Sequence, residues 1–399
     1  MVNILFATIF DYPHEGGLST HITTLKKGLE MRGHQVDIVS FSSFPSMLRT
    51  IYARVPGFLV NKWKKGKGQV YNDRNRKHLL SYYIKRRACK YDIVNAQDIY
   101  ATLATSELGI PTVATVHGYF SYEAISRGAI IKDSAEDYLI RQLEQGAYQQ
   151  ADEVVAVDRR IRDYIKGQSS VDAVVIKNFI DVDSFCPQDI DTSAVKNEFS
   201  IPHDFNILFV PRRLTEKNGV IYPVLALQNV IKKHPNTLLV YAGTGEQMPV
   251  IKKLVSELNL HNQVKLLGSV PHEKMKELYG ISDIVLIPSV HSHGVEEATS
   301  ISALEAMGSG APVIAGAVGG LKEIIENKKD GLLVRERDVE ELSSSILKLL
   351  EEPGYGDFLA KNARGKVEKE YSHLAAAEKF ESIYLDVIRR RSMDKPAMF

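Results

Sequence analysis

The sequence has few of the residues that mark disulfide-rich, metal-binding or membrane-spanning proteins. Its two cysteines, Cys89 and Cys186, supply neither a disulfide framework nor a metal-ligand spacing. No apolar run approaches the twenty or so residues of a membrane-spanning helix. The net charge of +1 gives no global attraction to nucleic acid. We therefore expect a protein of the reducing cytoplasm without a nucleic-acid partner.

What the chain does have is a repeated alternation of strand-like and helix-like segments. Its apolar start, residues 1–10, lacks a basic region before it, which favours a first β-strand over a signal peptide. At 399 residues the chain is too long for one ordinary core. The alternation weakens between residues 182 and 204 and then restarts. This pattern predicts an α/β fold with two doubly wound, Rossmann-like domains, residues 1–182 and 183–373.

A pair of glutamates eight residues apart, Glu297 and Glu305, lies between two hydrophobic strands of the second half. Helix geometry puts positions i and i+8 on one face, near a strand end where open α/β sheets bind ligands. The free N–H groups at the start of such a helix suit a phosphate. The alternative is that the pair binds no ligand: one glutamate would interact with the helix dipole and the other would be solvated on the helix surface.

Three further motifs follow predicted strands. Gly16 and Gly17 allow a close approach of the backbone to a ligand after the first strand, although most such pairs are only turns. Arg212 and Lys217, after the first strand of the second half, can clamp a diphosphate or form a solvated basic loop. His117, at the end of a strand, can bind a sugar hydroxyl or phosphate, or only its own turn. Neither a dinucleotide-binding fingerprint nor a P-loop spacing is present, which disfavours a dehydrogenase or an NTPase.

Residues 49–90 form the most basic stretch of the chain, with thirteen lysines and arginines and one acid, Asp73. Since the whole chain carries +1, the remainder carries about −11. Apolar residues such as Phe58 and Trp63 are interleaved with this charge. Such a stretch can lie on an anionic membrane, recognise an anionic acceptor or be a solvated insertion, and the sequence leaves these alternatives open.

Together these motifs resemble the retaining glycosyltransferases of the GT-B fold, family four in particular. The resemblance covers nearly the whole chain and is carried by EGGLSTHITTLKKGLEMRGHQV, TVHG, PRRLTEKNG, YAGTGEQ and LEAMGSGAPVIA in the usual order. Its most specific element is the glutamate pair followed by AMGSGAPVIA. The resemblance implies a GT-B fold with two domains facing each other across a cleft, the C-terminal helix, residues 374–399, packing back on the N-terminal domain.

The resemblance also implies a role for each motif residue. Arg212 and Lys217 would hold the donor diphosphate, Glu305 the ribose, and Glu297 and His117 the donor sugar. Backbone N–H groups at Gly16, Gly17, Ser300 and Ile301 would bind phosphate oxygens or the acceptor. The loop at Val270 would contact the base. The family commonly needs no metal or other cofactor. After the first glutamate the family usually has an aromatic residue or a proline and then a glycine, whereas this chain has Ala298, Thr299 and Ser300. This departure puts the identity of the donor sugar in doubt.

These implications predict a retaining transferase that moves a sugar, most often from a UDP-sugar, to a hydroxyl acceptor. Residues 1–182 would form the acceptor-binding domain. The product would be a cell-envelope glycan, a glycolipid or a small-molecule glycoside. Lipid-linked, glycan and small-molecule acceptors all remain open. The location would be cytoplasmic, with peripheral contact at the inner membrane face if residues 49–90 bind anionic lipid. The alternatives are a nucleotide-sugar-binding protein without transferase activity and a GT-B phosphorylase or epimerase, for which no pyridoxal-binding lysine motif is evident.

Overall fold

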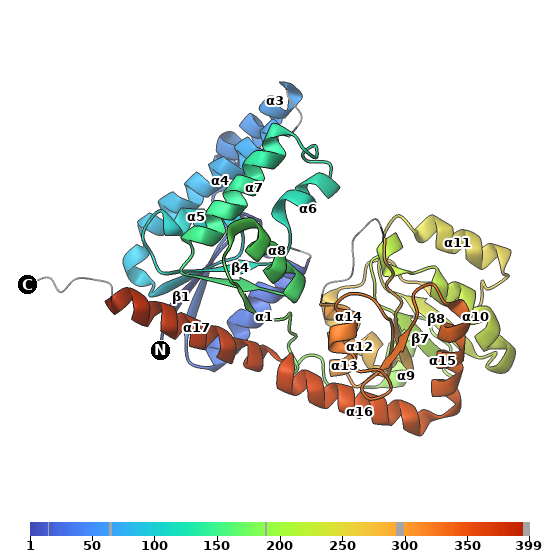
Figure 1. The fold of residues 1–399 in the computed structure, drawn as a ribbon. Coiled ribbons are helices and arrows are strands. Elements are labelled where there is room, and N and C mark those ends of the chain that lie inside the picture. The colour runs from blue at the N-terminus through green and yellow to red at the C-terminus, as the bar shows by residue number, and fades with distance from the viewer. Residues whose placement is uncertain (15, 64–65, 188–189, 293–298, 394–399) are drawn as a thin grey trace, which may run out of the picture. The chain divides into compact units, whose positions relative to one another are not determined.

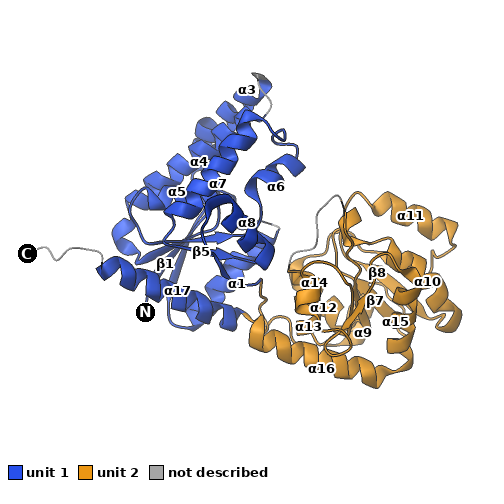
Figure 2. Ribbon diagram, in the orientation of Figure 1, with its two compact units in different colours: residues 1–177, 373–399 blue, residues 178–372 orange. Residues whose placement is uncertain are grey.

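The computed structural model describes residues 1–14, 16–63, 66–187, 190–292 and 299–393, and of Trp63 only its backbone. The chain divides into two compact units (Figure 2), named unit 1 (Met1–Lys177 with His373–Phe399) and unit 2 (Asn178–Ser372). The sequence predicted these divisions after residues 182 and 373. Each unit is a parallel sheet covered by helices, which confirms the predicted α/β class. No helix within the described ranges is long and apolar enough to cross a membrane.

Unit 1 is built on a six-stranded parallel sheet in the order β2-β1-β3-β4-β5-β6. Its four inner strands are short, buried runs rich in valine, isoleucine and alanine, as expected for a sheet covered on both faces, whereas the two edge strands are partly exposed. The strands are β1 (Asn3–Ala7), β2 (Gln35–Val39), β3 (Ile93–Ala96), β4 (Thr112–Val116), β5 (Glu153–Ala156) and β6 (Val174–Val175).

Helices cover both faces of this sheet (Figure 1). On one face α1 (Gly17–Met31) packs along α17 (His373–Met393), the last helix of the chain. Their backbones nearly touch, since a Cβ atom added to Gly28 would lie 2.5 Å from the carbonyl oxygen of His373. Four longer helices share the core of the other face: α4 (Lys67–Lys85), α5 (Ile99–Ser106), α7 (Ala135–Gln150) and α8 (Arg159–Ser169).

Short helices complete unit 1. They are α2 (Ser46–Arg49), a π-helical turn at Thr50–Arg54, α3 (Val55–Trp63) and α6 (Phe120–Ser126), with 3-10 turns at Phe41–Ser43 and Ala88–Lys90. Between α2 and α4 the chain runs as a nearly continuous helical stretch and turns back at α4, which pairs with α3.

Unit 2 repeats the architecture with the strand order β12-β11-β10-β7-β8-β9. The strands are β7 (Asn206–Val210), β8 (Thr237–Tyr241), β9 (Val264–Leu266), β10 (Ile284–Ile287), β11 (Val313–Gly316) and β12 (Leu332–Val334). One face is covered by α10 (Tyr222–Lys233), α11 (Met248–Glu257) and α15 (Val339–Glu351). The other is covered by α12 (His272–Gly280), α13 (Ile301–Gly308), α14 (Leu321–Ile324) and α16 (Pro353–Glu370), with α9 (Thr192–Glu198) nearby.

The two strand orders decide where a ligand fits. In unit 1 the chain winds outward on either side of β1, so the winding reverses between β1 and β3. In unit 2 it reverses between β7 and β10. At such switch points the loops after the two strands turn in opposite directions and leave a crevice at their carboxyl ends. The motifs predicted after the first strand of each half therefore belong to these two positions.

Candidate functional site

Arg212 lies at the switch point of unit 2, in the loop that follows β7. Its buried guanidinium donates from Nη1 to Ser300 Oγ at 2.8 Å, and from Nη2 to Ser289 Oγ at 3.1 Å and Asn218 Oδ1 at 2.6 Å. Ser289 follows β10, so one side chain ties together the loops after both strands of the switch point. We name these four residues, Arg212, Asn218, Ser289 and Ser300, the arginine cluster.

The loop after β7 approaches β10 closely only because it contains a glycine. Gly219 has φ +62°, and a Cβ atom there would lie 1.8 Å from the carbonyl oxygen of Pro288. Lys217 lies just before it in a 3-10 turn (Glu216–Asn218) and is half-buried. The carbonyl oxygen of Lys217 accepts from Val290 N at 2.9 Å, which fixes this turn to the end of β10. Arg212 and Lys217 therefore lie in one loop, which is hydrogen-bonded to the end of β10.

Ser300 links the arginine cluster to the start of α13. Its buried Oγ accepts from Ala303 N at 3.4 Å and so caps the helix, whose first residue is Ile301. The start of a helix carries a partial positive charge, and the guanidinium beside it carries a full one. The three described side-chain partners of Arg212 in this cluster are neutral. An anion is the ligand that this arrangement favours.

Glu305 lies buried on α13, so the alternative of a solvated helix glutamate is wrong. Its Oε1 accepts from His272 Nε2 and its Oε2 from Tyr279 Oη, both at 2.9 Å. The hydrogen bond to this carboxylate raises the pKa of His272. The two partners belong to α12, and the His272 side chain is 58% exposed. The carboxylate is thus held in place by a residue that solvent can reach.

Val270 lies between β9 and α12, half-buried against the core of unit 2. It precedes His272 by two residues, so the bond between His272 and Glu305 joins its loop to α13. The loop of Val270 is thus linked through His272 to α13, which carries Glu305 and Ile301 and is capped by Ser300 of the arginine cluster. Glu297 lies outside the described residues.

Sequence reasoning missed the residues that hold these groups. Asn218 stands next to Lys217 in the same turn, and Ser289 comes two residues after β10, so both carried a positional signal. His272 and Tyr279 gave none, because they reach Glu305 only after α12 has packed beside α13.

His117 of unit 1 follows β4 and belongs to a chain of side-chain hydrogen bonds. Asn95 Nδ2 donates to Tyr384 Oη at 2.6 Å, and Gln97 Nε2 donates to Asn95 Oδ1 at 2.9 Å. Gln97 Oε1 therefore faces His117 and accepts from its Nε2 at 2.9 Å. The proton of the neutral ring is thus on Nε2, which leaves Nδ1 as an acceptor. Burial lowers the pKa of His117 to about 4.

Gly16 and Gly17 lie at the start of α1, after β1, as predicted. Gly16 has φ +147°, which favours glycine, and Gly17 is the first residue of the helix. Asp98 holds the same switch point together. Its Oδ2 accepts from Thr8 Oγ1 and Ile9 N, and its Oδ1 accepts from Ala101 N, all at 2.8 Å.

The helical stretch 47–59, which overlaps the start of the basic segment 49–90, exposes an apolar stripe, and α3 packs against α4 through glycines. A Cβ atom on Gly68 would lie 2.1 Å from the carbonyl oxygen of Gly57, so no large side chain fits between the two helices. The large side chains therefore face outward, on successive turns of one helical face. We name them the α3 stripe: Met47, Leu48, Ile51, Tyr52, Val55, Phe58 and Leu59, which are 39–74% exposed.

Positive charge surrounds this stripe. The single acid of the segment, Asp73, is buried, and its burial raises its pKa to about 6. Lys62, Lys67 and Arg74 are exposed and form no ion pair with any residue that the structure describes. The surface of the segment is therefore apolar and basic.

Comparison with known proteins places both units in one group of enzymes. The family profile "Glycosyltransferase Family 4" matches residues 15–184, and the profile "Glycosyl transferases group 1" matches residues 191–366. An uncharacterized glycosyltransferase of Methanocaldococcus jannaschii is 26% identical over 94% of this chain and 96% of its own length.

Two solved structures share the fold over nearly the whole chain. Sucrose-phosphate synthase from Thermosynechococcus elongatus superposes with a TM-score of 0.72 at 19% identity, covering 98% of this chain and all of that one. Anabaena HepE, solved in complex with UDP, gives a TM-score of 0.69 at 18% identity over 97% of this chain and all of that one.

Proposed function

Since the chain belongs to the glycosyltransferases of the GT-B fold and the family-four type, we propose that it transfers a sugar from a nucleotide-sugar donor to an acceptor hydroxyl. The arginine cluster carries this proposal. It sets a buried guanidinium beside the start of α13, and the guanidinium also contacts Asn218, the residue after Lys217. A diphosphate is the anion whose length and charge suit two cations and a helix start together.

The positive groups that would bind the diphosphate would also promote the sugar-transfer reaction. The slow event in sugar transfer is departure of the nucleotide, which leaves negative charge on the diphosphate and positive charge on the sugar. Fixed positive groups stabilise that charge as it develops, and they need no reorganisation at the moment of reaction. We assign this role to Arg212 and Lys217. Because they supply the positive charge, we propose that turnover needs no metal ion, and a chelator such as EDTA should leave the rate unchanged.

A UDP-sugar is the donor that we propose. The related Anabaena fold was solved with UDP and with UDP-glucose. Glu305 would bind the ribose hydroxyls, exchanging its bonds to His272 and Tyr279 for bonds to the ligand. The loop at Val270 would meet the base, and the amides of Ser300 and Ile301 the phosphates.

We propose retention of configuration at the anomeric carbon. The acceptor hydroxyl would attack from the face that the diphosphate leaves, and the departing diphosphate would take its proton. Glu297 and His117 would contact the donor sugar, His117 accepting from a hydroxyl through Nδ1. Gly16 and Gly17 would offer backbone N–H groups to the diphosphate or the acceptor. The coupling constant of the anomeric proton in the product tests retention, and an inverted product would refute it.

The direct test of the function combines a donor panel with one substitution. UDP-, GDP- and ADP-sugars are screened by thermal shift, because a ligand that binds only the folded state raises Tm. Turnover of the best donor is then compared between wild type and Lys217→Ala. We expect a loss of about a hundredfold or more, the effect of removing one stabilising group from a preorganised site. Lys252→Ala, an exposed lysine of α11, is the control, and equal rates for the two variants would refute the site.

We also propose that the enzyme works at the cytoplasmic face of a membrane and binds anionic lipid through residues 49–90. The α3 stripe exposes large apolar side chains beside unpaired basic ones, the composition of a segment that lies in a lipid interface. Neither Cys89 nor Cys186 forms a disulfide in the described part of the chain, in keeping with a reducing compartment.

Vesicle sedimentation tests this contact. Wild type should bind phosphatidylglycerol vesicles and lose binding steeply as salt rises, while phosphatidylcholine vesicles bind weakly. Phe58→Asp should weaken binding at least tenfold without changing the urea midpoint, because Phe58 is 62% exposed. Leu385→Asp, at a 50% exposed leucine of α17, is the control. Binding that is independent of salt, or equally weakened in both variants, would refute the proposal.

A further inference from the structure

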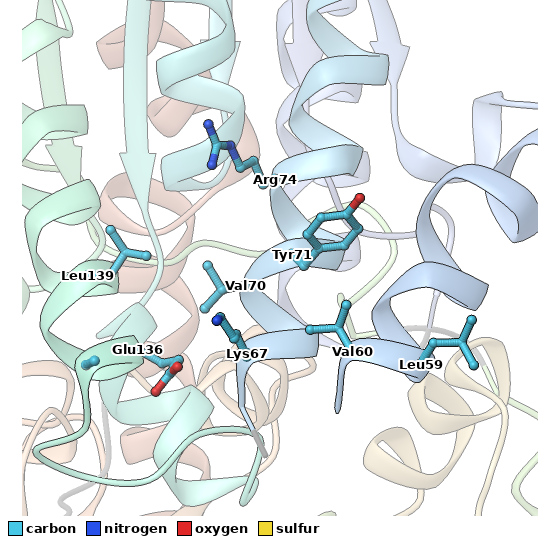
Figure 3. A pocket seen from close by; sticks show the side chains of 9 residues that line it. Leu59, Val60, Lys67, Val70, Tyr71, Arg74, Glu136 and Leu139 are labelled. Atoms are coloured by element: carbon cyan, nitrogen blue, oxygen red, sulfur yellow. The ribbon is translucent and has the colours of Figure 1, made fainter. Parts of the chain in front are cut away.

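A cavity of about 940 Å³ opens beside the α3 stripe, between α3, α4 and α7. Its volume is that of a site for a sizeable small molecule, which is roughly 300–1,000 Å³. Figure 3 shows the lining side chains, with Leu139 of α7 on one side and Val70 of α4 on the other. The lining consists of Leu59, Val60, Lys67, Val70, Tyr71, Arg74, Ala135, Glu136 and Leu139.

The walls of this pocket are mostly apolar and reach from the core to the surface. Val70 belongs to the buried core of unit 1, whereas Leu59 and Leu139 are 54% and 43% exposed. Leu59 is also a member of the α3 stripe. The pocket and the stripe therefore form one continuous apolar surface, and a hydrocarbon chain could pass from the stripe into the pocket without crossing water.

Two basic side chains stand at the same pocket. Lys67 and Arg74 are seven residues apart on α4, which places them on one face of the helix. Both are exposed, and neither forms an ion pair within the described part of the chain. A phosphate is the group that a lysine and an arginine bind best together, the arginine through its fork and the lysine as a point charge.

We propose that this pocket binds the hydrocarbon chain of a lipid-phosphate acceptor, with the phosphate between Lys67 and Arg74. The proposal rests on the proposed function, because it assigns a substrate class to the same enzyme. The mostly apolar walls disfavour a free sugar as the occupant. Lys67 and Arg74 outnumber the one acid of the lining, Glu136, and so favour an anionic head group over a neutral one. The continuity with the α3 stripe provides the path from a membrane.

Direct binding of simple alkyl phosphates tests the pocket without knowledge of the natural acceptor. Butyl, hexyl and octyl phosphate are titrated calorimetrically into the full-length protein, below the concentration at which they form micelles. Each methylene that leaves water contributes about 0.8 kcal/mol, so Kd should fall about fourfold per methylene. From butyl to octyl phosphate the gain should be on the order of a hundredfold. A Kd that does not change with chain length would overturn the proposal.

A matched pair of variants tests the location. Leu139→Asp places a charge in the pocket wall, whereas Tyr138→Asp places the same charge one residue away on α7, at a side chain that does not line the pocket. Both side chains are more than 40% exposed, so neither change should alter the urea midpoint. We expect Leu139→Asp to abolish the chain-length dependence and Tyr138→Asp to keep it. Equal dependence in both variants would overturn the pocket as the binding site.

The head-group assignment is tested separately. Arg74→Ala should weaken the binding of octyl phosphate about tenfold, because a hydrogen bond to a charged group contributes roughly 1.5–3 kcal/mol. The affinity for 1-octanol, which has no charge, should not change. Inorganic phosphate should compete poorly, since it lacks the chain. Unchanged octyl phosphate binding in Arg74→Ala, or inorganic phosphate that binds as tightly as octyl phosphate, would overturn the assignment.

These measurements contain no sugar donor, so their failure differs from failure of the proposed function. UDP binding with no alkyl phosphate binding would refute the pocket and leave the transferase standing. Chain-dependent binding without turnover of any donor would support the pocket and refute the transferase.

Discussion

The switch points of the two sheets are built alike but with opposite charge. In unit 1 the carboxylate of Asp98 joins the loop after β1 to the end of β3. In unit 2 the guanidinium of Arg212 joins the loop after β7 to the end of β10. Both groups are buried, and both connect the same two positions of a doubly wound sheet.

The difference lies in the partners. Asp98 is surrounded by donors of its own unit, Thr8, Ile9 and Ala101, and serves as a clamp and helix cap. Its burial raises its pKa. The described side chains that accept hydrogen bonds from Arg212 are neutral, and they orient its guanidinium. We therefore expect the same position in the fold to serve as a structural clamp in unit 1 and as an anion site in unit 2.

The largest expected effect is that of Arg212→Ala. Turnover should fall about a thousandfold, because the variant lacks a fixed positive charge beside the leaving group. Lost hydrogen bonds to Ser289, Ser300 and Asn218 should also lower the free energy of unfolding by about 2–3 kcal/mol. Arg212→Lys should recover little turnover, because an ammonium cannot reproduce the fork of the guanidinium. Steady-state kinetics and urea unfolding check both effects, and a lysine variant with wild-type turnover would contradict the account.

Glu305→Gln should have the next largest effect. Glu305 is buried like Asp98, but one of its partners, His272, is half exposed and can release it to a ligand. The neutral side chain should raise KM for the donor about tenfold, the value of roughly one charge-assisted hydrogen bond, with a smaller change in kcat. If KM stays at the wild-type value, Glu305 is a structural carboxylate like Asp98.

Asp98→Asn should change stability rather than catalysis. The amide of the variant keeps one oxygen as an acceptor, but its NH₂ group faces N–H or O–H donors and cannot accept from them. The lost hydrogen bonds should lower the free energy of unfolding by about 2 kcal/mol. The donor KM should change less than twofold. A stable Asp98→Asn protein with impaired turnover would remove the distinction between the two switch points.

The smallest expected effect concerns pH. The folded-state pKa of His117, about 4, lies below its ordinary value of 6.5. As the pH falls from 6.5 toward 4, the unfolded chain takes up a proton that the folded protein does not, so this residue reduces stability over that window. The free energy of unfolding measured with urea should therefore fall more steeply between pH 6.5 and 4 for wild type than for His117→Asn. Parallel curves for the two proteins would show that His117 is not held neutral.

Much of the fold could be predicted because its signals are local. Short apolar runs such as residues 206–210 are strands in the structure, and α13 starts at Ile301 beside its serine cap. Gly16 and Gly17 follow the first strand of the first half, and Arg212 and Lys217 follow the first strand of the second half. Their position after these strands was enough to predict them as candidate site residues.

The rest depends on contacts between distant segments. Arg212 meets Ser289 across 77 positions of sequence, and Glu305 meets His272 across 33, so no local pattern could predict either pair. The α3 stripe could be predicted only in part, because the sequence left open whether the apolar residues of this segment face a membrane. An apolar periodicity normally marks the buried face of a helix. Here Gly57 and Gly68 occupy the contact instead and leave the apolar face outside.

The central claim, that the switch point of unit 2 binds the donor diphosphate, is tested most directly by comparing UDP with uridine. Isothermal titration of each into wild type and Lys217→Ala isolates the diphosphate contribution as the ratio of the two Kd values. We predict that wild type binds UDP at least about tenfold more tightly than uridine, the value of one or more charge-assisted hydrogen bonds, and that Lys217→Ala loses most of this ratio. Equal Kd values for UDP and uridine in wild type would contradict the claim.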